Sequence, residues 1–118
     1  MIFMTFSKPF TPLEKIQLLQ RSILVSSYTY YELNNNLLSD YQYDTNAKQL
    51  AELKRQYSEA YRQSRYYGYF RDFCSEDDNQ HYTSGFDLLQ QVEEKDPELY
   101  RHIWIDAMLA LKLKGEGV

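Results

Sequence analysis

Each long apolar segment of this chain follows a short motif that starts an α-helix. Thr11-Pro12-Leu13-Glu14 combines an N-cap threonine, a proline at the first helical position and a glutamate that can bond the N-cap amide. Ser39-Asp40-Tyr41-Gln42 offers a second reciprocal capping box. No run alternates apolar and polar residues as a strand would, and no hairpin dipeptide occurs. The sequence therefore predicts an all-α protein, folded as a small helical bundle.

Apolar residues recur at three- and four-residue steps after these motifs, which predicts one domain over residues 1–118. The first helix should be apolar on one face and end before Asn34-Asn35-Asn36, because asparagine competes for backbone hydrogen bonds and tolerates left-handed conformations. The second should be long or kinked, with Gly68 the favoured place for a kink or an end. The first two form a helical hairpin, and two C-terminal helices follow. The expected helices cover residues 11–32, 39–73, 84–94 and 96–114.

The composition limits what the chain can do. Its 118 residues suit a single modest core. A formal net charge of −4 gives no general attraction to nucleic acid, which is therefore not expected as a partner. A single cysteine, a start without a secretory leader and the absence of about 18 uninterrupted apolar residues predict a cytoplasmic protein without a membrane span. Twelve tyrosines suit both a small core and a binding surface.

The segment from Tyr28 to Asp44 carries the most specific pattern in the chain. It has a tyrosine pair near the end of the first helix, then a short turn, then Ser-Asp-x-x-Tyr-Asp opening the second helix. Over residues 13–57 the chain resembles the N-terminal Ia domain of bacterial NAD-dependent DNA ligases. That domain recognises the nicotinamide mononucleotide (NMN) half of NAD+. The resemblance implies that NMN would contact Tyr30, Tyr31, Asp40, Tyr43 and Asp44.

The chemistry of these side chains agrees with such a ligand, since a cationic pyridinium ring favours aromatic faces and nearby carboxylates. The chain departs from the family at two places: Tyr31 stands where the family usually has histidine, and asparagines replace the usual turn proline. It also has no Lys-x-Asp-Gly, the motif whose lysine accepts AMP in the ligases. Ligation by this chain alone is excluded. The pattern predicts either a retained nucleotide site or the same scaffold without its ligand.

A second candidate surface alternates arginines with aromatic rings along residues 61–71. Tyrosine and arginine dominate many protein interfaces, and three arginines are few for nucleic acid. A protein partner is therefore expected, with contacts from Tyr61, Arg62, Arg65, Tyr66, Tyr69 and Arg71. The alternative is a partly buried helix end whose arginines reach out to water.

The remaining polar residues suggest no catalytic or metal site. Cys74 and His81 lie in a polar loop expected over residues 74–82, and no oxyanion-binding motif accompanies them. The acidic run at 76–79 lacks the glycine and ligand spacing of a calcium loop, and one cysteine with two histidines gives no zinc spacing. His102 and Trp104 are expected in the core or at its rim.

These observations predict a protein that binds rather than catalyses and requires no cofactor. The first hypothesis is a non-catalytic binding module, such as an accessory or inhibitor protein of a phage or other mobile element that binds a host protein. Anti-defence proteins, including anti-CRISPR proteins, fit this description. The alternative is a protein that binds or senses NMN or NAD+. The sequence leaves open whether the chain forms a homodimer.

Overall fold

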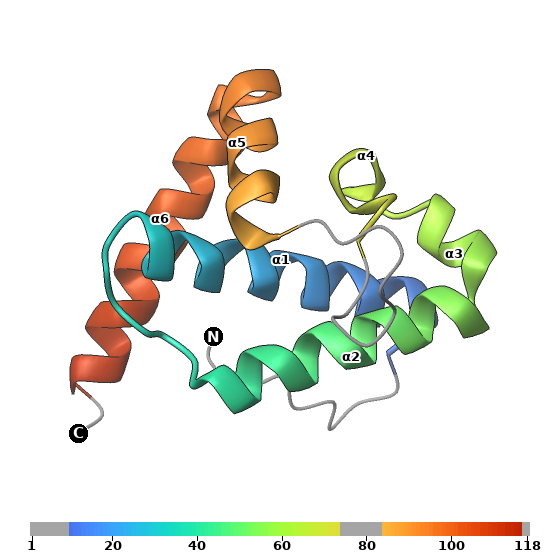
Figure 1. Ribbon diagram of the computed structural model, residues 1–118, viewed down its shortest axis with the longest axis horizontal. Coiled ribbons are helices and arrows are strands. Elements are labelled where there is room, and N and C mark those ends of the chain that lie inside the picture. Colours follow the sequence, from blue (N-terminus) through green and yellow to red (C-terminus); the bar gives the residue numbers. More distant parts are fainter. Residues whose placement is uncertain (1–9, 74–83, 117–118) are drawn as a thin grey trace.

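The computed structural model describes residues 10–73 and 84–116 of the chain, and these residues confirm the all-α prediction. Within them every regular element is a helix and none is a strand (Figure 1). The helices are α1 (Pro12–Tyr31), α2 (Asp40–Gln56), α3 (Ser58–Arg62), α4 (Tyr67–Phe70), α5 (Gly85–Lys95) and α6 (Pro97–Glu116).

Helix α1 runs through the middle of the molecule, with α2 antiparallel beside it (Figure 1). Helices α5 and α6 pack against its C-terminal half, and α3 and α4 lie toward its N-terminal end. The seven consecutive residues Ile23–Thr29 are all buried, so this part of α1 is covered on every side. The single apolar face predicted for this helix understated its burial, because polar residues such as Gln20 and Thr29 are also fully buried.

Both predicted capping boxes are present and start α1 and α2. The Thr11 hydroxyl accepts from the Glu14 amide at 3.1 Å, and Glu14 accepts from the Thr11 amide at 2.8 Å. Ser39 and Gln42 exchange the equivalent bonds at 3.1 and 2.9 Å. Between the two helices Asn34 has φ 51°, the left-handed conformation that asparagine tolerates. The hairpin turn therefore forms from local signals.

The prediction of one long or kinked helix over residues 39–73 is wrong, because the structure divides this range into three helices, α2, α3 and α4. The first break falls at Tyr57 (φ −127°, ψ 57°), while Gly68 lies inside α4. The breaks fold the chain back so that Tyr61 enters the core and donates to the Phe70 carbonyl at 2.7 Å. Lys54 of α2 donates to the carbonyls of Arg71 and Phe73 at 2.8 and 3.1 Å, which fixes the chain directly after α4 to α2.

Helices α5 and α6 form a second pair that packs on α1. The Ser84 hydroxyl accepts from the Asp87 amide at 3.1 Å, which caps the start of α5. An Asp96 carboxylate oxygen accepts from the Leu99 amide at 3.1 Å, which does the same for α6. The loop predicted over 74–82, with the Cys74–His81 pair and the acidic run, lies outside the described residues.

Candidate functional site

Four of the five residues implied by the ligase resemblance line one cavity of about 200 Å³, here called the tyrosine pocket. It lies where the end of α1, the turn after it and the starts of α2 and α5 meet. Asp44 is outside it and forms an ion pair with Lys48 at 3.1 Å, one helical turn away. The pocket is lined by Ser26, Ser27, Tyr30, Tyr31, Asn36, Leu37, Leu38, Asp40, Tyr43 and Gly85.

Aromatic rings form one side of the tyrosine pocket. The rings of Tyr30 and Tyr31 meet edge to face with centroids 4.8 Å apart, and Tyr31 lies 5.6 Å from Phe86. All three are about half exposed, so their faces are open to a ligand. Phe86 extends the cluster from α5, and its part was not predicted because α5 is distant in sequence. Tyr43 lies deeper, with its hydroxyl 3.3 Å from the Ser27 hydroxyl.

Asp40 and Gly85 bring two helix starts to the tyrosine pocket, since they are the first residues of α2 and α5. Helix N-termini carry partial positive charge and attract anions. The Asp40 carboxylate offsets this charge at α2. The pocket therefore combines aromatic faces, a carboxylate and hydroxyls, which suits a cationic ring with hydroxyl groups better than a bare anion.

The arginine- and tyrosine-rich segment is only partly a surface. Tyr61 and Tyr66 are 1% and 5% exposed, so a partner cannot reach their rings, and the prediction for these two residues is corrected. Tyr61 comes from α3 and Tyr66 from the turn before α4. Both side chains lie in the hydrophobic core, where burial of an aromatic ring is strongly favourable. Arg62, Arg65 and Arg71 are exposed and Tyr69 is half-buried, so the alternative reading, a partly buried segment with solvated arginines, describes this part of the chain.

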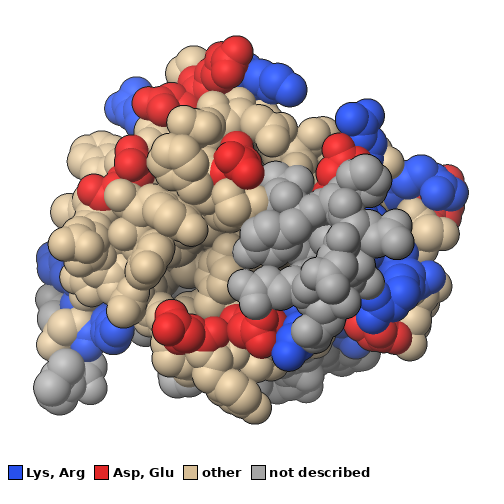
Figure 2. Space-filling model, viewed as in Figure 1, with Lys and Arg blue, Asp and Glu red and all other residues tan. Residues whose placement is uncertain are grey.

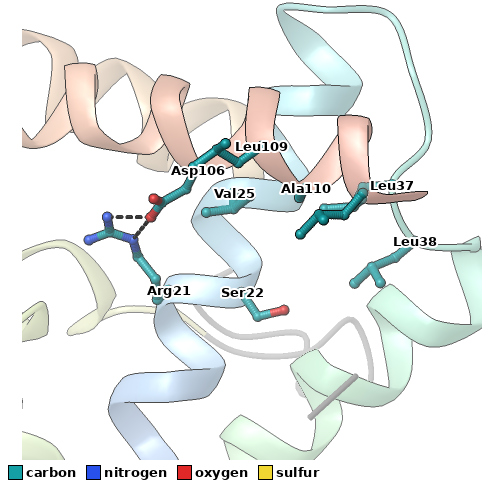
Figure 3. A pocket seen from close by; sticks show the side chains of 9 residues that line it. Arg21, Ser22, Val25, Leu37, Leu38, Asp106, Leu109 and Ala110 are labelled. Atoms are coloured by element: carbon teal, nitrogen blue, oxygen red, sulfur yellow. Dashed lines mark hydrogen bonds and ion pairs between the residues drawn. The ribbon is translucent and has the colours of Figure 1, made fainter. Parts of the chain in front are cut away.

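A larger cavity of about 310 Å³ lies between α1, α6 and the turn after α1, here called the α1–α6 groove (Figure 3). Leu37 and Leu38 come from the turn, Val25 from α1, and Leu109 and Leu113 from α6, so most of the lining is apolar. No part of it was predicted from the sequence, although two leucines directly after three asparagines were a signal that this turn is packed. The lining is Arg21, Ser22, Val25, Leu37, Leu38, Asp106, Leu109, Ala110 and Leu113.

A polar network holds one end of the α1–α6 groove. Arg21 donates from Nε and Nη2 to Asp106 Oδ2 at 3.0 and 2.5 Å (Figure 3), and from Nη1 to the Tyr66 hydroxyl at 2.8 Å. Burial lowers the pKa of Arg21, but the bonds to Asp106 and Tyr66 outweigh it and the net pKa lies above its usual value. Arg21 is therefore a fixed cation that joins α1 to α6. Lys114 donates to the Asn36 carbonyl at 2.6 Å and ties the turn to α6.

The outer face of α6 is more exposed than the sequence suggested. Trp104 is 44% exposed and His102 is also exposed, so their predicted place in the core or at its rim is corrected. Ile105, Met108, Leu109 and Leu113 are between 38% and 57% exposed. In the view of Figure 2, the Lys and Arg residues lie mainly at the margins, and the described residues between them are mostly tan with some acidic side chains. The described residues of this face therefore form no continuous basic surface of the kind that binds phosphates.

The described residues define a class: a small all-helical protein whose cavities include the mixed tyrosine pocket and the apolar α1–α6 groove. Among them no three His, Cys, Asp or Glu side chains gather in a way that could hold a metal ion. The helices described here are all too short or too polar to cross a bilayer. No protein-family model, no curated protein and no solved structure matches the chain. The resemblance to the ligase Ia domain stays a prediction from the residues that carry it.

Proposed function

We propose that this protein is a non-catalytic binding module that takes an apolar side chain of a partner protein into the α1–α6 groove. The observation that carries the proposal is the groove itself, about 310 Å³ in volume and lined mainly by aliphatic side chains. Leu109 and Leu113 at its edge are 55% and 57% exposed, although full burial of a leucine is worth roughly 1.5–3 kcal/mol. A partner that covers them gains about half of this free energy for each leucine, because each is already nearly half buried.

The shape and the charges favour a helical partner segment. An amphipathic helix binds such a groove through one or two large apolar residues, and polar residues around them fix its position. Here Arg21 and Asp106 supply the polar end of the groove, and their mutual ion pair at 2.5 Å keeps it rigid. A side chain that fills the apolar part would be a binding hot spot. The biological role that we propose is an accessory or inhibitor protein of a phage or other mobile element, anti-defence proteins included, acting on a host protein.

Affinity capture with matched variants tests this proposal. The immobilised chain is exposed to bacterial lysate in three forms: wild type, the double variant Leu109→Glu, Leu113→Glu, and the control Tyr41→Glu. Tyr41 is 80% exposed on α2 and lines neither cavity, so its variant introduces the same carboxylate elsewhere. A partner should bind the wild type and the control and be lost from the groove variant. The captured partner is then purified and titrated against the same three proteins.

The proposal is wrong if every protein captured by the wild type is captured equally by the groove variant. Circular dichroism of the groove variant must show wild-type helicity and melting. Because both leucines are more than half exposed, we expect the two glutamates to leave the fold intact.

A second candidate function is the binding of NMN, and one specific observation favours it. Tyr30, Tyr31, Asp40 and Tyr43, which the ligase resemblance named from the sequence, all line the tyrosine pocket. The pocket volume of about 200 Å³ is below the roughly 300–1,000 Å³ of most ligand sites. It suits the nicotinamide end of a mononucleotide rather than complete NAD+, with the ring against the tyrosines and Asp40 near the ribose or the amide.

Isothermal titration with NMN and with NAD+ tests this second candidate. The site variant is Asp40→Ala with Tyr30→Ala, and the matched control is Asp44→Ala, which removes a carboxylate one turn along α2 that does not line the pocket. Micromolar NMN binding that the site variant loses and the control keeps would support a nucleotide site. No heat up to millimolar ligand, or equal binding by both variants, would refute it.

A further inference from the structure

The outer face of α6 carries a row of large apolar side chains that the described residues leave uncovered. Trp104, Ile105 and Met108 are 44%, 38% and 48% exposed, whereas Ile103 and Ala107 on the opposite face are fully buried. Helix α6 is therefore apolar on both faces, and only its inner face is covered by the described core. A helix with a second apolar face normally packs against another element.

Charged residues stand at both ends of this row. Glu98, Ile105 and Lys112 are seven residues apart, which is nearly two full turns, so they share one line along the helix. Arg101 and Met108 each follow three residues later and complete the line. We call these five exposed residues the α6 seam. Glu98 and Lys112 are exposed and take part in none of the ion pairs found among the described residues.

We propose that the α6 seam binds the same seam of a second copy of this chain, with the two helices antiparallel and a two-fold axis beside Ile105. Glu98 and Lys112 both lie seven residues from Ile105. Glu98 of one copy then faces Lys112 of the partner subunit, and the symmetry repeats this pair at the other end. Such self-complementary contacts are what a two-fold dimer interface requires.

The charges select this arrangement over the alternatives. A parallel pairing would place Glu98 against the same residue of the other copy, and likewise Lys112. An antiparallel pairing shifted to join Ile105 with Met108 would bring Arg101 opposite Lys112. Like charges in contact disfavour an interface strongly, and charged residues beside an apolar seam set the orientation of paired helices. Of these three arrangements, the one with its axis at Ile105 gives opposite charges at both ends.

The length of α6 and the width of its outer face suit a modest dimer. Its 20 residues extend about 30 Å, and Trp104 widens the seam on one side. A single helix face is smaller than the roughly 800 Å² per partner of a standard stable interface, so we expect a weak, reversible dimer. None of the five seam residues lines the tyrosine pocket or the α1–α6 groove. Dimerisation therefore uses side chains that neither cavity uses.

A charge-swap experiment tests both the dimer and its orientation. Sedimentation equilibrium of the full chain over a wide range of concentrations should show a reversible dimer. Glu98→Lys and Lys112→Glu should each weaken it by about tenfold, because each change creates two like-charge contacts. The double variant should return to wild-type affinity, because it restores both pairs with the signs exchanged. The control Tyr41→Glu should dimerise like the wild type.

The proposal is overturned if the wild type is monomeric at every concentration, or if the double charge swap dimerises no better than the single variants. Ile105→Glu places a carboxylate at the axis and should give a monomer with wild-type helicity; if it unfolds, Met108→Glu takes its place in the same measurement. Oligomeric state is measured without any ligand or second protein. A failure here is therefore distinct from a failure of the groove or of the tyrosine pocket.

Discussion

Gly85, the first residue of α5, lies so close to Ser27 of α1 that a Cβ atom at position 85 would fall 2.3 Å from the Ser27 hydroxyl oxygen. The same Cβ would be 3.0 Å from Ser27 Cβ and 3.0 Å from the Tyr43 hydroxyl. Both neighbours are part of the packed wall of the tyrosine pocket, so neither can move away freely. A side chain at this position must push α5 away from α1.

Gly85→Ala should therefore lower the free energy of unfolding by about 1–3 kcal/mol, the usual cost of overpacking. Urea unfolding followed by circular dichroism measures the change. Adding Ser27→Gly removes the 2.3 Å and one 3.0 Å contact and should recover part of the loss. Gly68→Ala is the matched control, because nothing lies within 4 Å of its added Cβ. Equal stability of the Gly85 and Gly68 variants would show that α5 is not held this tightly.

Gln20 of α1 is fully buried, and the nitrogen and the oxygen of its side-chain amide differ in their hydrogen bonding. Its Nε2 donates to the Ser64 hydroxyl at 3.0 Å, but its Oε1 has no hydrogen-bond partner among the described residues. A buried acceptor without a partner costs about 1–3 kcal/mol. Gln20→Met keeps the side-chain length and removes the acceptor, so it should raise the free energy of unfolding by about 1 kcal/mol.

Ser64→Ala is the comparison with the opposite sign. It removes the acceptor for Gln20 and the bond that Ser64 donates to the Tyr61 carbonyl at 2.7 Å, so it should lower stability by about 1–3 kcal/mol. Both variants are measured by urea unfolding at neutral pH. A loss of stability in Gln20→Met as large as that in Ser64→Ala would contradict the unsatisfied acceptor.

The local part of this fold could be predicted from the sequence, and the long-range part could not. Capping boxes at Thr11 and Ser39 depend on residues three apart, which is why they were predictable. The Arg21–Asp106 bonds join residues 85 positions apart, and no sequence pattern links them. The break at Tyr57 also lacks a breaking residue. It arises because burial of Tyr61 is worth more than the regularity of one long helix.

The two cavities likewise combine residues that are close in sequence, which could be predicted, with residues that are distant in sequence, which could not. Four residues of the tyrosine pocket were named from the sequence because they lie within the first helical hairpin, while Gly85 was missed because it comes from α5. Trp104 on the outer face of α6 was expected in the core or at its rim, since helical spacing alone cannot tell which of two apolar faces is covered.

Tyr100 makes the free energy of unfolding depend on pH in the alkaline range. Its hydroxyl donates to Glu32 at 2.8 Å and its ring meets Tyr28 edge to face at 5.4 Å. Burial is the main cause that raises the pKa of Tyr100 above its usual value of 10, and the bond and charge of Glu32 and the charge of Glu93 raise it further. The folded protein therefore holds this proton more tightly than the unfolded chain.

Protonated Tyr100 therefore adds its full contribution to the free energy of unfolding below a pH of about 10. This contribution is lost as the pH rises toward the raised pKa. Thermal melting from pH 8 to pH 12 should show a fall in Tm that begins at about pH 10. Tyr100→Phe should lower Tm at neutral pH, because it loses the bond to Glu32, and should make the alkaline fall shallower. Tyr41→Phe, an exposed control, should keep the wild-type profile; an unchanged slope in Tyr100→Phe would refute this role.

Asn34 sets the turn on which both cavities depend, because Leu37 and Leu38 follow it and line both. Its φ of 51° is left-handed, a conformation that costs most side chains roughly 1–2 kcal/mol and costs glycine little. Asn34→Ala should therefore lower the free energy of unfolding by about 1 kcal/mol, while Asn34→Gly should leave it nearly unchanged. Asn35→Ala is the control, since only the backbone amide of Asn35 bonds the Thr29 carbonyl, at 2.9 Å, and the substitution keeps it. Urea unfolding compares the three variants. If Asn34→Gly proved as unstable as Asn34→Ala, the asparagine side chain and not its backbone conformation would be what holds the turn.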